Sequence, residues 1–197
     1  MSTNSAFGSV LREAWYDFCM HWKTVLTFWF KQTKPEQRFA KRKKFDAVIR
    51  RKFLKTYMQI VRGEKAEWRA NACGRLAEIV VLDQFARNMF RDTPSMFAHD
   101  ALALALAQEA IRAGADKKLT REERMFLYMP FMHSESRVIH RESLKLFKGL
   151  GNKEALWYAR DHKKIIDRFG RYPHRNKVLG RKITAVEKKF LKTHKGY

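Results

Sequence analysis

A row of polar side chains interrupts an otherwise apolar segment at residues 82–91. Asp83 and Arg87 stand four residues apart, a spacing that places both on one face of a helix. The full row consists of Asp83, Arg87 and Arg91, with Gln84 and Asn88 beside it. A polar group left unpaired inside a buried helix costs several kcal/mol. The segment therefore predicts either ion pairs, an Asp83–Arg87 pair first among them, or side chains that line a cavity.

A second candidate is the sequence Tyr-Met-Pro-Phe-Met-His-Ser-Glu at residues 128–135. Pro130 within this helical pattern forces a bend or an end, and it leaves backbone groups free beside His133 and Glu135. A histidine close to a carboxylate can act as an acid and base or can bind a metal ion. Because no His-Glu-x-x-His and no clustered Cys/His spacing occurs, we favour acid–base chemistry and expect no metal site. The pattern identifies no cofactor.

The third candidate is the sequence Arg-Phe-Gly-Arg-Tyr-Pro-His-Arg-Asn at residues 168–176. Gly170 and Pro173 fix the backbone here, so the polar side chains are held by a stiff loop. These side chains are Arg171, His174, Arg175 and Asn176. Arginine suits a carboxylate or phosphate that is held by two hydrogen bonds. Alternatively, the arginines cap helix ends or pair with the acidic residues of the first two segments.

The elements that position these residues are expected to be helices, because helical periodicity dominates the chain and no strand-like alternation occurs. The pattern predicts helices at residues 9–30, 45–60, 74–90, 98–113, 120–133, 136–150, 152–169 and 184–191. The helix at 74–90 is apolar over most of its surface and should be the buried central one. Capping boxes begin at Thr120 and Thr184. About eight helices with short connections predict an all-α fold of stacked antiparallel pairs.

Length and composition indicate one compact protein. We expect residues 1–24 to form an aromatic helical extension and residues 25–197 a single all-α domain. The apolar run at 24–30 is too short to span a bilayer, so no transmembrane segment is expected, and no secretory signal pattern opens the chain. Two cysteines among 197 residues predict no disulfide framework. These features favour a cytoplasmic location.

The charge of the chain is strongly positive and unevenly distributed. Lys and Arg number 42 against 20 Asp and Glu, a net charge of +22. Residues 38–55 hold nine basic residues and one acid, residues 163–197 hold twelve and two, and residues 74–134 hold eight of each. Such basic flanks could follow a nucleic-acid backbone or lie on anionic lipid. They could equally be a lysine-rich surface that keeps the protein soluble without a partner.

Two common enzyme classes lack their signatures. No Gly-x-Ser-x-Gly motif occurs, and the nine glycines stand singly rather than in a phosphate-binding loop. Serine hydrolases of that type and the common nucleotide-binding enzymes are therefore not expected.

The three polar segments, in this order, resemble a bacterial family, number 924 among the domains of unknown function. Further matching pieces lie at residues 25–30, 97–102 and 179–181, and the likeness extends over about residues 25–191. The resemblance implies a tetratricopeptide-like helical stack and no settled reaction. The motif positions of the family correspond here to Asp83, Gln84, Arg87, Asn88, Tyr128, His133, Glu135, Arg171, His174, Arg175 and Asn176.

These observations predict a pocket between the helix at 74–90 and the loop at 168–176 that binds an anionic small molecule. The arginines expected to hold the anion are Arg87, Arg171 and Arg175. The candidate acid and base groups are His133, Glu135 and Asp83. Further ligand-binding side chains would be Gln84, Asn88, Tyr128, His174 and Asn176. The sequence leaves open whether such a ligand is only bound or also converted.

Two alternatives come from other classes of protein. The basic flanks, together with tryptophans and tyrosines that can stack on bases, are compatible with a nucleic-acid-binding module. A helical stack can also serve as a scaffold that binds peptides on a concave surface. In that scaffold the polar motifs would be ion pairs that fix how the helices pack.

Overall fold

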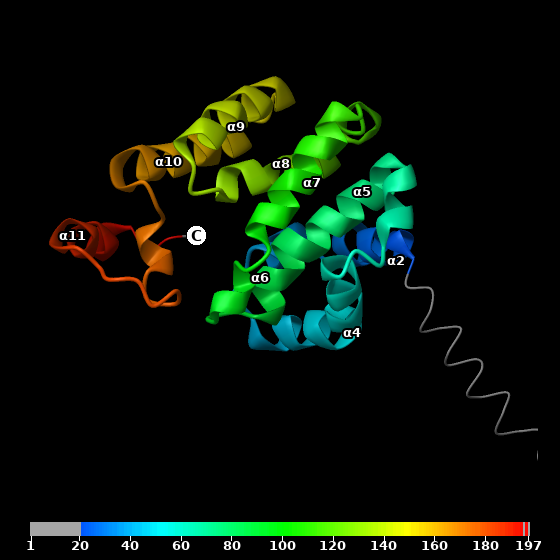
Figure 1. The fold of residues 1–197 in the computed structure, drawn as a ribbon, viewed down its shortest axis with the longest axis horizontal. Coiled ribbons are helices and arrows are strands. Elements are labelled where there is room, and N and C mark those ends of the chain that lie inside the picture. The colour runs from blue at the N-terminus through cyan, green and yellow to red at the C-terminus, as the bar shows by residue number, and fades with distance from the viewer. Residues whose placement is uncertain (1–20, 195, 197) are drawn as a thin grey trace, which may run out of the picture.

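The structure is a computed structural model that describes residues 21–194 and 196. Every regular element in these residues is a helix, which confirms the predicted all-α class (Figure 1). None of the described helices is long and apolar enough to cross a membrane.

The N-terminal helices surround the central one. Helix α2 (Trp22–Leu26) continues directly as the π-helical turn η1 (Thr27–Gln32). Pro35 then opens the short helix α3 (Pro35–Arg38), and the residue before it is extended, as a following proline requires. Helix α4 (Lys43–Val61) follows and confirms the helix predicted at 45–60.

The helix predicted at 9–30 is described from Trp22 onwards. Residues 1–20, and with them most of the predicted extension at 1–24, lie outside the described residues. Within the described part, Val25 and Trp29 are fully buried and belong to the main core.

The predicted central helix is present and buried. It consists of α5 (Ala72–Ile79), the π-helical segment η3 (Val80–Phe85) and α6 (Ala86–Met89), which form one continuous helix. All six residues of η3 are buried, although Asp83 and Gln84 are among them. A π-helical insertion changes which side chains share a helix face, and such insertions occur frequently at functional sites.

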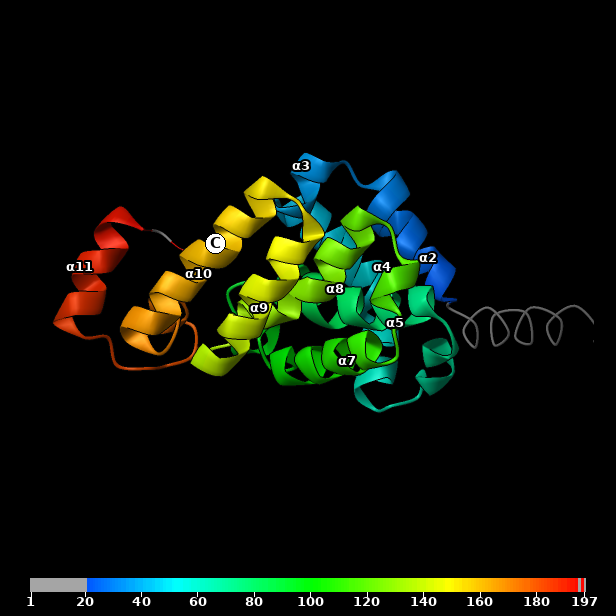
Figure 2. The same ribbon diagram turned by 90° about the horizontal axis from the view of Figure 1, so that it is seen from above.

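The second half of the chain is a row of helices in which each packs against the next. In chain order they are α7 (Asp100–Arg112), α8 (Arg121–His133), α9 (Arg137–Leu150), α10 (Lys153–Phe169) and α11 (Ala185–Thr193). Figure 2 shows α7, α8, α9 and α10 side by side. Short 3-10 turns connect the elements: η2 (Ala66–Ala70), η4 (Pro94–Met96), η5 (Asp116–Lys118) and η6 (Pro173–Arg175).

The predicted signals for helix ends are confirmed. Thr120 and Thr184 each accept a hydrogen bond from the backbone N–H three residues later, which completes the two capping boxes. Gly151 and Gly170 close α9 and α10 with φ of 70° and 69°, the left-handed conformation that glycine adopts without steric cost.

Two apolar cores hold these helices together. The larger core extends from α2 to the first half of α10, and within it the rings of Trp29, Phe85 and Phe126 pack edge to face. The smaller core consists of Ile165, Ile166 and Tyr172, with Phe169 and Phe190 packed against it. The C-terminal end of the molecule therefore has a core of its own, and the polar site described below lies between this end and the main body.

Close backbone packing at Gly74 provides a test of the fold. A Cβ at Gly74 would overlap the carbonyl group of Trp68, whereas a Cβ at Gly149 in α9 would meet no atom within 4 Å. We expect Gly74→Ala to lower the free energy of unfolding by about 1–3 kcal/mol, because the overlap forces the backbone to move. Urea denaturation followed by circular dichroism measures this change.

Gly149→Ala is the matched control for this variant. The same substitution in open helical space should leave stability unchanged or raise it by up to about 1 kcal/mol. Equal stability of the two variants would contradict the close contact between η2 and α5.

Candidate functional site

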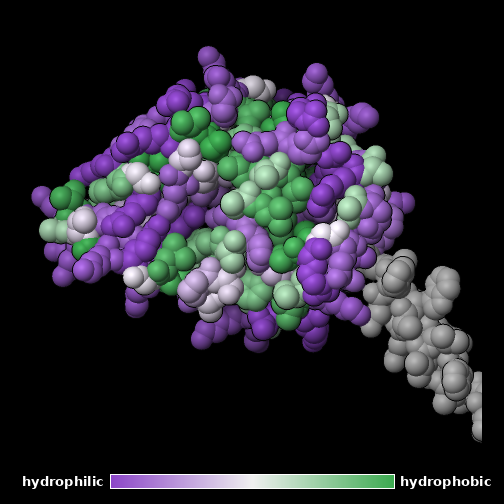
Figure 3. All heavy atoms as spheres, viewed as in Figure 1, coloured by the Kyte–Doolittle hydropathy of each residue, from purple (hydrophilic) through white to green (hydrophobic). Residues whose placement is uncertain are grey.

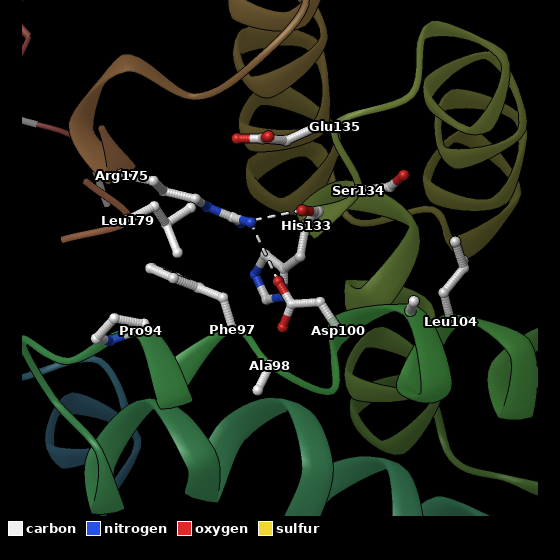
Figure 4. A pocket seen from close by; sticks show the side chains of 11 residues that line it. Pro94, Phe97, Ala98, Asp100, Leu104, His133, Ser134, Glu135, Arg175 and Leu179 are labelled. Atoms are coloured by element: carbon white, nitrogen blue, oxygen red, sulfur yellow. Dashed lines mark hydrogen bonds and ion pairs between the residues drawn. The ribbon is translucent and has the colours of Figure 1, made fainter. Parts of the chain in front are cut away.

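A cavity of about 360 Å³ lies between the segment from η4 to α7, the end of α8, and the turn η6 (Figure 4). Its apolar lining consists of Pro94, Phe97, Ala98, Ala101, Leu104 and Leu179. Its polar lining consists of Asp100, His133, Ser134, Glu135 and Arg175. The helix at 72–89 is not part of this lining. It lies behind the wall, because two of its side chains contact His133 and Asp100.

His133 and Asp83 form a hydrogen-bonded pair at this wall. Nδ1 of His133, the last residue of α8, lies 2.6 Å from Oδ1 of the fully buried Asp83. A carboxylate only accepts hydrogen bonds, so Nδ1 carries the proton and Nε2 presents its lone pair. Within residues 21–194, no group hydrogen-bonds to Nε2. The side chain of His133 is 15% exposed and the residue lines the cavity, and Nε2 is not among the side-chain atoms that are buried without a partner.

Electrostatics keep Asp83 ionised and His133 neutral. Burial by itself would raise the pKa of Asp83, but the charge of Arg87 and the interaction with His133 outweigh burial and hold that pKa well below its usual range. Burial, aided by the charge of Arg87, lowers the pKa of His133 below its ordinary value. A neutral imidazole next to a permanent carboxylate is the state in which histidine can accept a proton.

Asp100 connects two arginines at the cavity. Its carboxylate accepts two hydrogen bonds of 3.0 Å from Arg87, and Nη1 of Arg175 lies 3.1 Å from Oδ2 of the same group. Arg87 also lies 3.1 Å from Asp83, so the ion pair expected within the helix is present. The arrangement joins the central helix, the start of α7 and η6 through charged hydrogen bonds.

Arg175 is held by two aromatic rings and by hydrogen bonds at its tip. Its guanidinium carbon lies 4.4 Å from the ring centroid of Phe97 and 4.6 Å from that of Tyr172. Its Nη2 donates to the backbone carbonyl of His133 at 3.0 Å. Tyr172 likewise donates through its hydroxyl to the carbonyl of Met132. These side chains satisfy carbonyls that the end of α8 leaves without helical partners, which holds His133 in place.

Glu135 lies at the polar wall but its carboxylate is already engaged. Arg181 donates two hydrogen bonds to it, of 2.6 and 3.0 Å, and the backbone N–H of Tyr172 donates a third of 2.8 Å. Burial would raise the pKa of Glu135, and these donors lower it instead. A carboxylate held in this way fixes the loop more readily than it transfers a proton.

Three of the predicted ligand-binding residues lie away from the cavity. Gln84 donates to the carboxylate of Asp83 and contacts the sulfur of Met129. Asn88 donates to the carbonyl of Gln84 within the central helix. The hydroxyl of Tyr128 donates to Asp116 at 2.8 Å.

The predicted basic loop is divided between two environments. Arg175 lines the cavity, whereas Arg171 forms a two-bond ion pair with Glu187 of α11 at 2.7 and 3.0 Å. His174 and Asn176 are part of the loop but not of the cavity lining. The sequence indicates that the loop is stiff, but it does not show that Arg171 and Arg175 have different partners.

Two charged residues of the site were not predicted as site residues. Asp100 bridges the arginines, and Arg181 holds Glu135. Both lie in segments that match the resembled family, at 97–102 and 179–181, but neither stands in a polar cluster. Acidic residues are common in the first turn of a helix because they interact favourably with the helix dipole. The position of Asp100 in the sequence therefore does not by itself indicate a role in a site.

By its fold and site, this is an all-α protein of packed helices with a histidine–aspartate pair at the wall of a cavity. More particularly, the chain belongs to the family of bacterial proteins of unknown function called domain of unknown function 924, whose model matches residues 25–195. It is similar to the solved structure of a protein of unknown function from Agrobacterium tumefaciens. The two are 35% identical over 88% of this chain and 97% of that one, with a TM-score of 0.84. The comparison with curated proteins finds no match.

The described residues contain no group of three or more His, Cys, Asp or Glu side chains that could hold a metal ion. The tetratricopeptide-like arrangement implied by the resemblance stays a prediction.

Three histidines gather around Tyr172, of which His140 and His162 are buried and His174 is partly buried. The ring centroids of His140, His162 and His174 lie 6.2, 5.7 and 5.4 Å from that of Tyr172. Burial is the main cause that lowers their pKa values, to about 4 for His140, about 2 for His162 and about 3 for His174. Together with His133, these residues are neutral in the folded protein at pH 7.

The lowered pKa values of His133, His140, His162 and His174 predict that the folded protein loses stability in acid. Below about pH 6.5 the unfolded chain takes up protons that the folded chain refuses, so stability is present above that pH and is lost as the pH falls. His140, His162 and His174 each contribute about 1.4 kcal/mol per pH unit within this window, or about 4 kcal/mol per pH unit together, and the lowered pKa of His133 acts in the same direction. Urea denaturation at pH 7.5, 6.5 and 5.5 measures the slope.

His140→Gln should reduce that slope by about one proton, because it removes one buried imidazole that titrates only in the unfolded chain. The amide N–H of the glutamine can replace the Nε2–H that donates to the carbonyl of Ser134, which preserves the fold. His21→Gln, at a solvent-exposed position, is the control that should leave the slope unchanged. A flat stability profile between pH 7.5 and 5.5 would show that these histidines are not buried as neutral groups.

Proposed function

We propose that this protein binds an anionic small molecule in the cavity and that His133 transfers a proton to or from it. The observation that carries the proposal is the pair formed by Asp83 and His133, in which the histidine lines the cavity and its Nε2 has no hydrogen-bond partner among the described residues. A histidine whose two ring nitrogens were both bonded within the protein could not accept a proton from a ligand. Here one nitrogen is bonded and the other is accessible.

The proton chemistry follows from the two protonation states. Neutral His133 accepts a proton at Nε2 from a bound water or from a substrate group, and Asp83 then faces an imidazolium instead of an imidazole. The buried carboxylate stabilises that cation, while Nδ1–H stays bonded to it and the ring keeps its orientation. The same imidazolium returns its proton to a leaving or product group. General acid–base catalysis of this kind contributes roughly 10²–10⁴-fold in rate.

The cavity offers different surfaces for the two parts of such a ligand. Phe97, Leu104 and Leu179 provide an apolar wall. Arg175 provides a guanidinium that contacts two aromatic rings and whose Nε is buried without a partner among the described residues. An anionic group bound beside Asp100 would accept hydrogen bonds from Arg87 and Arg175, the two arginines that also donate to Asp100. The net charge of +22 also raises the concentration of anions near the protein.

The tautomer of His133 tests the catalytic part of the proposal. Long-range ¹H–¹⁵N NMR at pH 7 should show a neutral ring protonated at Nδ1, because Asp83 accepts that proton. In Asp83→Asn the preference should weaken. A ring that is protonated at Nε2 or at both nitrogens in the native protein would exclude His133 as the base.

Ligand binding tests the anion-binding part. A thermal-shift screen of anionic metabolites at about 0.3 M salt screens surface charge beyond about 8 Å. A ligand present at one hundred times its dissociation constant should add about 2.7 kcal/mol of stability, which raises Tm by several degrees. The shift should disappear in Arg175→Gln.

Arg171→Gln is the matched control, because Arg171 is an arginine of the same loop that pairs with Glu187 outside the cavity. If Arg175→Gln fails to fold, mass-spectrometric mapping of diethylpyrocarbonate modification replaces it. A true cavity ligand protects His133 from this reagent. A shift lost equally in both arginine variants, with His133 left unprotected, would place the anion elsewhere.

A further inference from the structure

Helix α10 carries a row of basic side chains on its outer face. Arg160, Lys164 and Arg168 follow at intervals of four residues, and Lys153 extends the row in the first turn. All of them are exposed, whereas the opposite face of the helix buries Ala159, His162 and Ile166. The fifteen residue-to-residue steps from Lys153 to Arg168 correspond to about 22 Å along the helix axis.

The charges of this row are not neutralised within the described protein. Arg160, Lys164 and Lys153 form no ion pair among residues 21–194. The same helix carries three acids: Asp167 accepts from Lys163, Asp161 accepts from His194, and Glu154 is exposed in the first turn. Like charges at i,i+4 destabilise a helix by roughly 0.2–0.5 kcal/mol per pair. An unpaired row is therefore a cost to the folded protein that an anionic partner would remove.

The row continues onto α11. Arg168 lies over the ring of Phe169 at 4.9 Å and near that of Phe190 of α11 at 5.9 Å, so the two helices meet at this arginine. Lys188, Lys189 and Lys192 of α11 are exposed. Figure 3 shows hydrophilic side chains dominating the part of the molecule that contains α10 and α11.

A large aromatic side chain interrupts the basic row. Trp157 lies one turn before Arg160 on the same outer face and is 58% exposed. Its ring packs edge to face on that of Tyr158, with 5.0 Å between centroids, so one face of the indole is left to solvent. An exposed indole beside a row of cations is the combination that proteins use to bind unpaired bases and their phosphates together.

We propose that the outer face of α10, continued by α11, binds single-stranded nucleic acid. The cations would contact successive phosphates, and Trp157 would stack on one base. Trp157 and Tyr158 of α10 and Val186 of α11 are large apolar side chains that are exposed on these two helices. They stand among charged residues and form no continuous apolar face for insertion into a membrane, which favours nucleic acid over lipid as the anionic partner. The surface is separate from the cavity at His133, so this proposal does not depend on the proposed function.

Fluorescence anisotropy with a labelled uridine 20-mer tests the proposal. Four phosphate contacts from Lys153, Arg160, Lys164 and Arg168 predict a contribution of about −2.8 to the slope of log K against log salt. Arg160→Ala/Lys164→Ala should make the measured slope about 1.4 less steep. Lys117→Ala/Lys118→Ala removes the same charge from η5, where the chain is balanced in charge, and should leave the slope unchanged.

Trp157 provides the second measurement. Trp157→Ala should weaken binding roughly fivefold or more without changing the salt slope, because stacking is lost and the phosphate contacts remain. Trp157→Phe should retain most of the affinity. A His133→Gln variant should bind the oligonucleotide as well as the native chain does, which keeps the two proposals apart.

Three outcomes would overturn the proposal. One is binding that falls equally in the α10 and η5 double variants, which would indicate only the overall charge. Another is Trp157→Ala with unchanged affinity. The third is absence of oligonucleotide binding combined with attachment to phosphatidylserine vesicles that is lost in Arg160→Ala/Lys164→Ala, which would assign the face to lipid.

Discussion

The burial of one carboxylate organises the centre of this protein. Asp83 is inaccessible to solvent yet ionised, and an unpaired charge in that position would cost several kcal/mol. It is compensated by His133 from the end of α8 and by Arg87 from its own helix. Arg87 in turn holds Asp100, and Asp100 holds Arg175. One buried charge thus brings four separate segments of the chain to the same place.

The cavity is a consequence of this arrangement. The C-terminal part of the molecule has its own small core, and charged hydrogen bonds connect it to the main body beside the cavity. Polar contacts fix direction more strictly than apolar packing does, but they do not fill space as tightly. An opening of about 360 Å³ remains where the two parts meet, and His133 lies at its wall.

The charge of the molecule has two different roles. Around Asp83 each arginine is paired, so charge there determines structure. On the outer face of α10 the cations lack partners among the described residues, so charge there is available for an interaction. The same residue types therefore support separate proposals for the cavity and for the surface, and the net charge of +22 by itself distinguishes neither.

By itself the sequence determined the helices, their ends and the buried central one, because periodicity, capping boxes and glycines act over a few residues. It also singled out Asp83 and His133, since polar groups in apolar segments require an explanation. Only the tertiary structure decided which partners meet. Arg171 and Arg175 are four residues apart in one stiff loop, yet one pairs with Glu187 and the other with Asp100. Pairing across 75 residues depends on how helices pack, and no local pattern encodes it.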